Sequence, residues 1–167
     1  MKSYIFIINV LLLISSVSVL SAQEKQNEDL FSQFEHSFVT NFKVPPQLHE
    51  RCLPIVTIMS IKFDEYGNIS ALNFSDSAYP QFVQEVFRIK DSIQFRYLYE
   101  EISALGKQNE NILIPIQINP GIVGVCASRV LQFDLLNLYL FNKKPLEGKY
   151  FLYKNITYFI LKTRTIF

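Results

Sequence analysis

The residues best suited to chemistry in this sequence are two cysteines, Cys52 and Cys126, and two histidines, His36 and His49. Their spacing does not match a tetrahedral zinc site. A nucleophilic thiol would need Cys52 with His36 or His49 as its base, and nothing else around His49 supports such a pair. In an oxidising compartment a pair of cysteines instead indicates a possible disulfide, which leaves the two histidines as solvated surface residues.

The carboxylates and glycines form no recognisable catalytic motif. Asp64 and Glu65 are adjacent and could act as acid and base, but they lie in a predicted turn, where solvated acids are common. Glu100 and Glu101 are likewise expected to be surface charges. The glycines lack the spacing of a phosphate-binding loop, and no serine lies in a nucleophile elbow. We therefore expect no enzyme activity, no cofactor and no metal site.

The first 22 residues have the pattern of a secretory signal peptide. Lys2 precedes an apolar run from Tyr4 to Leu20, and the small residues Ser21 and Ala22 come before a polar segment. The run is about 17 residues long, whereas an α-helix needs about 20 apolar residues to span a bilayer. We expect cleavage near Ala22 and export to the periplasm or beyond, with an uncleaved membrane anchor as the alternative.

Residues 23–167 have the composition of one globular domain. Hydrophobic residues make up 49% of the whole chain and charged residues 19%, which excludes a disordered chain. Residues 23–126 carry 8 lysines and arginines against 13 acidic residues, whereas residues 127–167 carry 7 against 2. This basic end alternates with aromatic residues, which fits either a surface for anionic partners or a strand with solvated lysines over a buried aromatic face. Export argues against nucleic acid, so we expect the second interpretation.

The predicted elements give an α+β fold. Apolar residues at helical spacing predict helices over residues 28–42 and 80–93. Residues 54–74 alternate as two strands around a tight turn, in which Gly67 supplies a positive φ. Together with a strand over residues 112–118, they predict a small antiparallel or mixed sheet packed by two helices, followed by an aromatic C-terminal extension.

Other segments leave more than one structure open. Residues 75–77 offer side-chain oxygens that could cap the second helix. Residues 95–111 begin either as an extension of that helix or as a second short one, and end as a loop. Residues 130–141 fit a helix and a buried strand about equally well, while the aromatic and β-branched composition of residues 149–161 favours extended structure.

The strand over residues 112–118 contains Pro115, which has no N–H to donate to a neighbouring strand. We therefore expect this strand either to lie at a sheet edge or to be hydrogen-bonded on one side only at that position. An exposed edge can accept a partner's strand by β-augmentation. The predicted partner-binding residues are Ile112, Leu113, Ile114, Pro115, Ile116, Gln117 and Ile118.

The order of these elements resembles the C-terminal domain of the TonB family. Over about residues 44–118 the chain runs as a proline-containing approach (KVPPQLHERC), a hairpin (IVTIMSIKFDEYGNISALNF), a helix (PQFVQEVFRIKDSI) and a strand (ILIPIQI). In that family the first strand ends in an aspartate, a turn and a glycine, which Asp64 to Gly67 match. The chain departs from the family at Phe95, where members have tryptophan or proline, and it lacks the long proline-rich spacer. The resemblance implies an exported end module, extended by residues 127–167, that binds another envelope protein.

Three functions follow as hypotheses. We expect a non-catalytic exported protein that binds an envelope protein through a sheet edge, with no nucleic-acid partner and with membrane attachment only through an uncleaved N-terminus. The first alternative is a carrier of a small apolar ligand or lipid, in which the aromatic C-terminal segment closes a pocket over the sheet. The second is an unrecognised enzyme. A deep apolar pocket would favour the carrier, and a bare edge with a shallow surface would favour partner binding.

The topology predicts a disulfide between Cys52 and Cys126. If the strand over residues 112–118 runs antiparallel to the strand over residues 54–64, Cys52 and Cys126 flank the same end of the sheet, where their Cα atoms could lie about 5–6 Å apart. The bond would close a loop of about 75 residues and stabilise the fold by up to roughly 4 kcal/mol. Peptide mapping of the native protein without reductant should recover the two peptides linked, whereas two alkylated thiols would show that the cysteines are unpaired.

Overall fold

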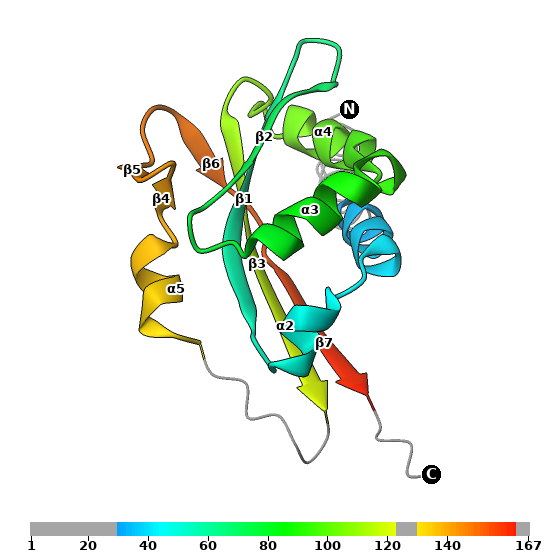
Figure 1. The fold of residues 1–167 in the computed structure, drawn as a ribbon. Helices are drawn as coiled ribbons and strands as arrows, with labels where there is room; N and C mark the ends of the chain where they lie inside the picture. The colour runs from blue at the N-terminus through cyan, green and yellow to red at the C-terminus, as the bar shows by residue number, and fades with distance from the viewer. Residues whose placement is uncertain (1–29, 123–129, 163–167) are drawn as a thin grey trace, which may run out of the picture.

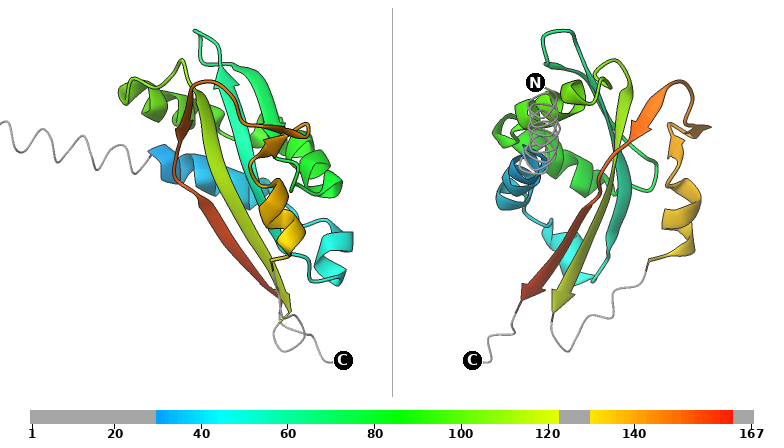
Figure 2. Two further views of the ribbon diagram at one scale, coloured as in Figure 1. Left: turned by 90° about the vertical axis from the view of Figure 1, so that its left-hand side faces the viewer. Right: turned by 180° about the vertical axis from the view of Figure 1, so that it is seen from behind.

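One mixed β-sheet divides the molecule into three layers in the computed structural model (Figure 1). The structure describes residues 30–122 and 130–162. Helices cover one face of the sheet, and a C-terminal segment lies on the other (Figures 1 and 2). Within the described residues the strands in sheet order are β2 (Ile69–Phe74), β1 (Ile55–Phe63) and β3 (Asn111–Ile122), then β6 (Tyr150–Leu152) and β7 (Ile156–Lys162), which both pair with β3. The predicted α+β fold is confirmed, while the predicted signal peptide lies outside the described residues.

The hairpin of β1 and β2 forms as predicted. The two strands pair antiparallel, with Met59 opposite Phe74. The carboxylate of Asp64 accepts hydrogen bonds from the backbone N–H groups of Tyr66 at 2.9 Å and Asn68 at 2.8 Å, which fixes the turn. Gly67 has a φ of +84°, the left-handed conformation for which glycine was expected.

The helix layer contains the two predicted helices and, after them, the second of the two structures expected for residues 95–111. A helix over residues 30–41 and α3 (Pro80–Ile89) correspond to the predicted helices over residues 28–42 and 80–93, although α3 ends four residues early. α4 (Phe95–Ala104) is a second short helix rather than an extension of α3. The short 3₁₀ helix η1 (Lys90–Ser92) separates them, because Ile93 adopts extended backbone. The main buried residues of this layer are Phe31, Phe34, Phe38, Phe42, Phe82, Val86, Ile89, Leu98 and Ile102.

Two local expectations differ from the structure. The proline-containing approach includes a short helix, α2 (Pro46–Glu50), which Pro46 can begin because the first helical residue needs no N–H donor. The residues preceding α3 do not cap it through their side chains, since its N-cap is Tyr79 with no side-chain hydrogen bond. The hydroxyl of Ser75 instead accepts from Ile58 N at 2.9 Å and lies 2.8 Å from Thr57 Oγ1, so it serves the sheet.

The prediction that residues 112–118 form a sheet edge is wrong. β3 pairs antiparallel with β1, Ile55 lying opposite Ile118, as the disulfide argument assumed. On its other side β3 pairs in parallel with β6 and β7, and these strands come from the C-terminal extension. The extended structure expected for residues 149–161 is therefore confirmed in β6 and β7, and these strands cover the predicted partner-binding strand.

Pro115 lies opposite the interruption between β6 and β7. Tyr153 N donates to Leu113 O at 2.8 Å, and in a parallel ladder the next bond would run from the N–H of residue 115 to Tyr153 O. Proline cannot make that bond, so the ladder stops there. It resumes with one additional residue on the C-terminal side, because Leu113 lies opposite Leu152 but Ile116 lies opposite Ile156. Hydrogen bonding on one side only at Pro115, the second of the two expectations, is thus the correct one.

Parallel pairing requires a crossover connection, and the third layer is part of it. The chain passes from β3 to β6 through α5 (Gln132–Asn137), β4 (Leu140–Phe141) and β5 (Lys144–Pro145) on the face of the sheet opposite the helices (Figure 1). Residues 130–141 therefore contain a short helix followed by a two-residue strand.

The carboxylate of Asp76 fastens this crossover to the hairpin. It accepts hydrogen bonds from the backbone N–H groups of Asn142 at 3.0 Å and Lys143 at 2.6 Å, and Asp76 N donates to Leu140 O at 2.7 Å. The Asp76 carboxylate thus satisfies two backbone donors of the β4–β5 turn. Because this acceptor is charged, each of the two hydrogen bonds is stronger than one between neutral groups.

Replacing Gly67 with alanine tests how closely the hairpin turn packs on α4. An ideal Cβ at Gly67 would lie 2.6 Å from Tyr99 Cδ1, in addition to the cost of a positive φ. We expect Gly67→Ala to lower the free energy of unfolding by about 2–4 kcal/mol. Gly148→Ala is the matched control, because Gly148 also has a positive φ but open space around it, so only about 1–2 kcal/mol is expected. Equal losses in urea unfolding would contradict the close contact.

Candidate functional site

The outer side of β2 is a free sheet edge within the described residues. β2 ends the strand order, and its only strand partner there is β1. Ser75 N donates to Ile58 O at 2.9 Å, so the antiparallel alternation turns the backbone groups of Asn73 toward β1 and those of Leu72 and Phe74 outward. An incoming strand would meet the N–H and C=O groups of Leu72 and Phe74.

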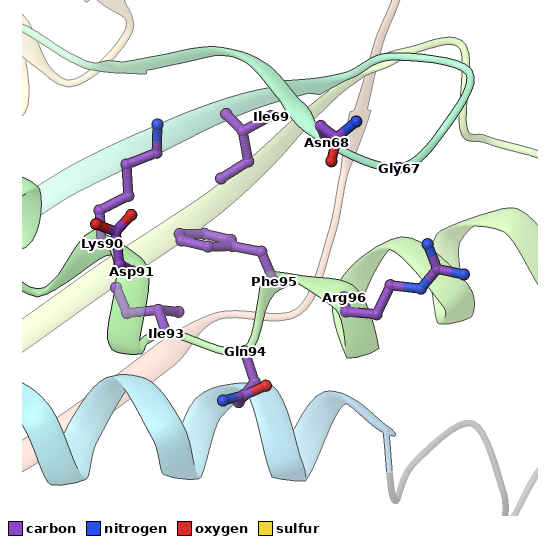
Figure 3. A pocket seen from close by; sticks show the side chains of 9 residues that line it. All are labelled: Gly67, Asn68, Ile69, Lys90, Asp91, Ile93, Gln94, Phe95 and Arg96. Carbon is purple, nitrogen blue, oxygen red and sulfur yellow. The ribbon is translucent and has the colours of Figure 1, made fainter.

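A hollow of about 350 Å³ adjoins the start of this edge (Figure 3). Ile69 and Phe95 face each other across it, with Lys90 and Asp91 at one end and the hairpin turn at the other. Three segments line it: the hairpin, η1 and the start of α4. The full lining is Gly67, Asn68, Ile69, Lys90, Asp91, Ile93, Gln94, Phe95 and Arg96.

The start of α4 holds the turn that forms one rim of the hollow. Arg96 Nη1 donates to Tyr66 O at 3.2 Å, and the hydroxyl of Tyr99 donates to Glu65 O at 3.3 Å. The guanidinium of Arg96 also lies over the Tyr99 ring, 5.4 Å from its centroid. The hairpin turn is therefore fixed relative to the helix layer.

The lining of this site combines apolar and polar side chains. Ile69, Ile93 and Phe95 are its apolar residues, and its charged residues are Lys90 and Asp91 at one end, together with Arg96. Asp64, considered above as an acid–base residue, serves the turn instead. Its hydrogen bonds from Asn68, first from the side chain and then from the backbone, lower the pKa of the carboxyl, so it stays ionised as an acceptor.

A buried carboxylate that sequence reasoning placed at the surface lies elsewhere, on α4. Glu101 is 1% exposed, so the expectation of a surface charge is wrong for it. Its Oε1 accepts hydrogen bonds from the Tyr153 hydroxyl and from Lys154 Nζ, the latter at 3.3 Å. Its Oε2 is buried with no hydrogen-bond partner in the described part of the chain. Burial, and then the hydrogen bond to Glu101, raises the pKa of Tyr153 far above its usual value, so the phenol remains a donor.

This cluster ties the C-terminal strands to the helix layer. Tyr153 and Lys154 lie between β6 and β7, at the interruption opposite Pro115. The Tyr153 ring packs edge-on against the Phe31 ring, with centroids 5.3 Å apart. Lys154 Nζ lies 5.4 Å from the centroid of the Phe31 ring. Tyr153 and Lys154, which are not paired in the parallel ladder, thus contact two helices: α4 through Glu101 and the helix over residues 30–41 through Phe31.

The cysteines and histidines do not gather into a site in the described residues. Cys52 takes part in a disulfide bond, but Cys126 lies outside the described residues, so their pairing stays a prediction. His36 is exposed near Thr40, 3.4 Å from its hydroxyl, and the side chain of His49 lies outside what the structure describes. Within residues 30–122 and 130–162, no three or more His, Cys, Asp or Glu side chains lie where they could hold a metal ion.

None of the described helices has the length and apolar character needed to cross a bilayer. Comparison with family models, curated proteins and solved structures finds no match to this chain.

Removing the carboxylate of Glu101 tests whether it fastens the C-terminal strands. Glu101→Ala leaves the Tyr153 hydroxyl without its acceptor, and we expect a loss of about 1–3 kcal/mol in the free energy of unfolding. Glu100→Ala is the matched control on the same helix, because Glu100 makes only an exposed ion pair with Arg96, worth less than about 1 kcal/mol. A loss for Glu101→Ala no larger than for the control would show that the cluster does not hold these strands.

Proposed function

We propose that this protein is a non-catalytic exported binding module that takes an extended segment of another envelope protein onto the outer edge of β2. The observation that carries the proposal is the free edge of β2, with the backbone groups of Leu72 and Phe74 facing outward and a hollow adjoining the start of the strand at Ile69. Strand addition of this kind draws its affinity from backbone hydrogen bonds and its specificity from side-chain pockets.

The composition of β2 supports this role. Its sequence, ISALNF, contains no proline and no charged residue, the features that commonly protect an edge strand from pairing. Its side chains at 72 and 74 contact the core, while those at 70 and 73 are exposed. The strand is thus fixed in place by packing and remains open along its outer side.

The opposite edge of the sheet is less suited to a partner. It is made by β6 and β7, which are separated by residues 153–155, and the register changes by one residue across that interruption. Bulges and lysines both discourage edge pairing, and this edge has Lys154 at the interruption. The β1–β2 pair also has a register shift, but it lies at the start of β2, between Ile69 and Ala71, and leaves Leu72 to Phe74 in regular register. A continuous partner strand would therefore pair more readily with β2.

The hollow suggests what the partner segment carries. A side chain placed beside Ile69 would meet Phe95 below it and Lys90 and Asp91 at one end. An apolar residue would bury surface there, and a polar neighbour could pair with either charge. We therefore infer a partner segment with β-branched or aromatic residues.

The carrier alternative has less support. The hollow of about 580 Å³ near α5, whose described lining is Asp76, Asn137, Asn142 and Lys143, is open to solvent and is not the deep, enclosed pocket that a carrier needs.

A proline at position 72 tests the binding mode. The N–H of Leu72 points outward, so Leu72→Pro removes a donor for the partner without removing a β1–β2 hydrogen bond. After a photo-reactive residue at Asn73 identifies the partner, we expect Leu72→Pro to weaken its binding at least about fivefold more than Leu72→Ala, which loses the same packing but keeps the N–H. Isothermal titration measures both affinities, and thermal unfolding monitors the fold.

The contrasting variant is Asn73→Pro, whose lost N–H faces β1, so that the hairpin rather than binding should suffer. If Leu72→Pro and Leu72→Ala bind the partner equally, or if the cross-link forms from Thr157 on β7 instead of from Asn73, the partner uses another surface.

A further inference from the structure

The crossover layer exposes a cluster of large apolar side chains that the proposed partner site does not use. We call it the α5 patch: Leu131, Leu135, Leu136 and Tyr139, which are 48%, 57%, 67% and 64% exposed. α5 is a short helix on the side of the sheet opposite the other helices (Figures 1 and 2). A binding surface is the simplest explanation for several leucines that are exposed to this extent next to one another.

The patch is presented on a supported element. Asp134 on α5 is fully buried, and its Oδ2 accepts a hydrogen bond from Leu131 N at 2.9 Å at the start of the helix. Beyond the helix, Leu146 N donates to Tyr139 O at 3.3 Å, and Asp76 holds the β4–β5 turn as described above. The exposed leucines therefore have a defined position without packing into the core.

The charge around the patch is positive. The β4–β5 hairpin that follows it carries Lys143 and Lys144, both exposed, and Lys149 is exposed shortly after. The acid on α5, Asp134, is turned inward and buried, so among these crossover residues Glu147 is the exposed acid. The basic and aromatic C-terminal end noted in the sequence thus places lysines beside exposed leucines.

We propose that the α5 patch docks on an anionic phospholipid surface, with Leu135, Leu136 and Tyr139 entering the interface and Lys143 and Lys144 contacting headgroups. Leucines next to lysines are the composition of interfacial membrane contacts. Lysines near a membrane add affinity only where the lipids are anionic. The helix stands out on the flank of the molecule, and a bilayer can accept such a projection without a complementary cavity (Figure 2).

Vesicle partitioning of the full chain tests the proposal. The probes are vesicles of phosphatidylcholine alone and with about 30% phosphatidylglycerol. We expect Leu135→Ser/Leu136→Ser to lower partitioning onto the anionic vesicles about tenfold or more. The control Phe87→Ser/Leu105→Ser alters residues that are 49% and 43% exposed elsewhere, and it should stay within about twofold of the parent. Any contribution of the N-terminal apolar segment is common to all variants and cancels in the comparison.

The charge contribution has a separate readout. Lys143→Gln/Lys144→Gln should weaken binding to anionic vesicles about 30-fold, at about fivefold per lysine, and leave binding to phosphatidylcholine unchanged. The protein has no tryptophan, so Leu136→Trp supplies a single fluorophore whose emission should shift to the blue with anionic vesicles. Phe87→Trp should show no such shift, which keeps the test valid even if the serine variants fold poorly.

Three results would overturn the proposal. Equal partitioning of the parent and Leu135→Ser/Leu136→Ser would mean that the patch does not meet lipid. Equal shifts for Leu136→Trp and Phe87→Trp would mean that association is not specific to this face. A self-association in sedimentation that disappears in Leu135→Ser/Leu136→Ser, without vesicle binding, would assign the patch to a second copy of the chain.

Discussion

The parallel pairing of β3 with β6 and β7 is the interaction on which the rest of the structure depends. It changes β3 from an edge strand into a central strand and buries Ile156 in the core. Parallel strands cannot be joined by a tight turn, so this pairing also requires the crossover that carries α5 and the β4–β5 hairpin to the second face of the sheet. Pro115 interrupts the pairing at one position, and the residues opposite it, Tyr153 and Lys154, contact Glu101 instead.

The two proposed surfaces follow from that arrangement. Because the C-terminal strands occupy the outer side of β3, the edge that a single continuous strand forms within the described residues is that of β2, and the α4 residues Arg96 and Tyr99 support it at its start. The crossover lies on the face of the sheet opposite the helices, and Leu135 and Leu136 are exposed there, close in sequence to Lys143 and Lys144. One surface offers backbone groups and the other offers apolar side chains, which is why we assign them different partners.

The sequence predicted local structure well and long-range pairing poorly. The hairpin could be predicted because Asp64, Gly67 and two alternating strands all lie within one short segment. The proline at 115 correctly indicated a missing hydrogen bond, but a missing donor at one position cannot show whether another strand pairs on either side of it. The segment that forms β6 and β7 was expected to be extended, but its composition does not indicate which strand it pairs with. Its pairing with β3 joins segments that are far apart in the sequence.

The buried Glu101 was missed for a different reason. Leu98 and Ile102 define the buried face of α4, and helical spacing from Leu98 places Glu101 on that face. The burial of Glu101 could be predicted only after residues 95–104 were known to form a separate helix. The free edge of β2 and its hollow depend on the relative positions of η1, α4 and the hairpin, and no local pattern encodes them.

Hydrogen exchange of individual backbone amides tests the central claim most directly, because it reports which strand has the free edge. If the C-terminal strands cover β3, the outward-facing amides of Leu113 and Gln117 should exchange at rates close to global unfolding, while those of Leu72 and Phe74 exchange by local opening and much faster. The reverse order, with slow exchange at Leu72 and fast exchange at Gln117, would show that β3 is the free edge and would contradict the account.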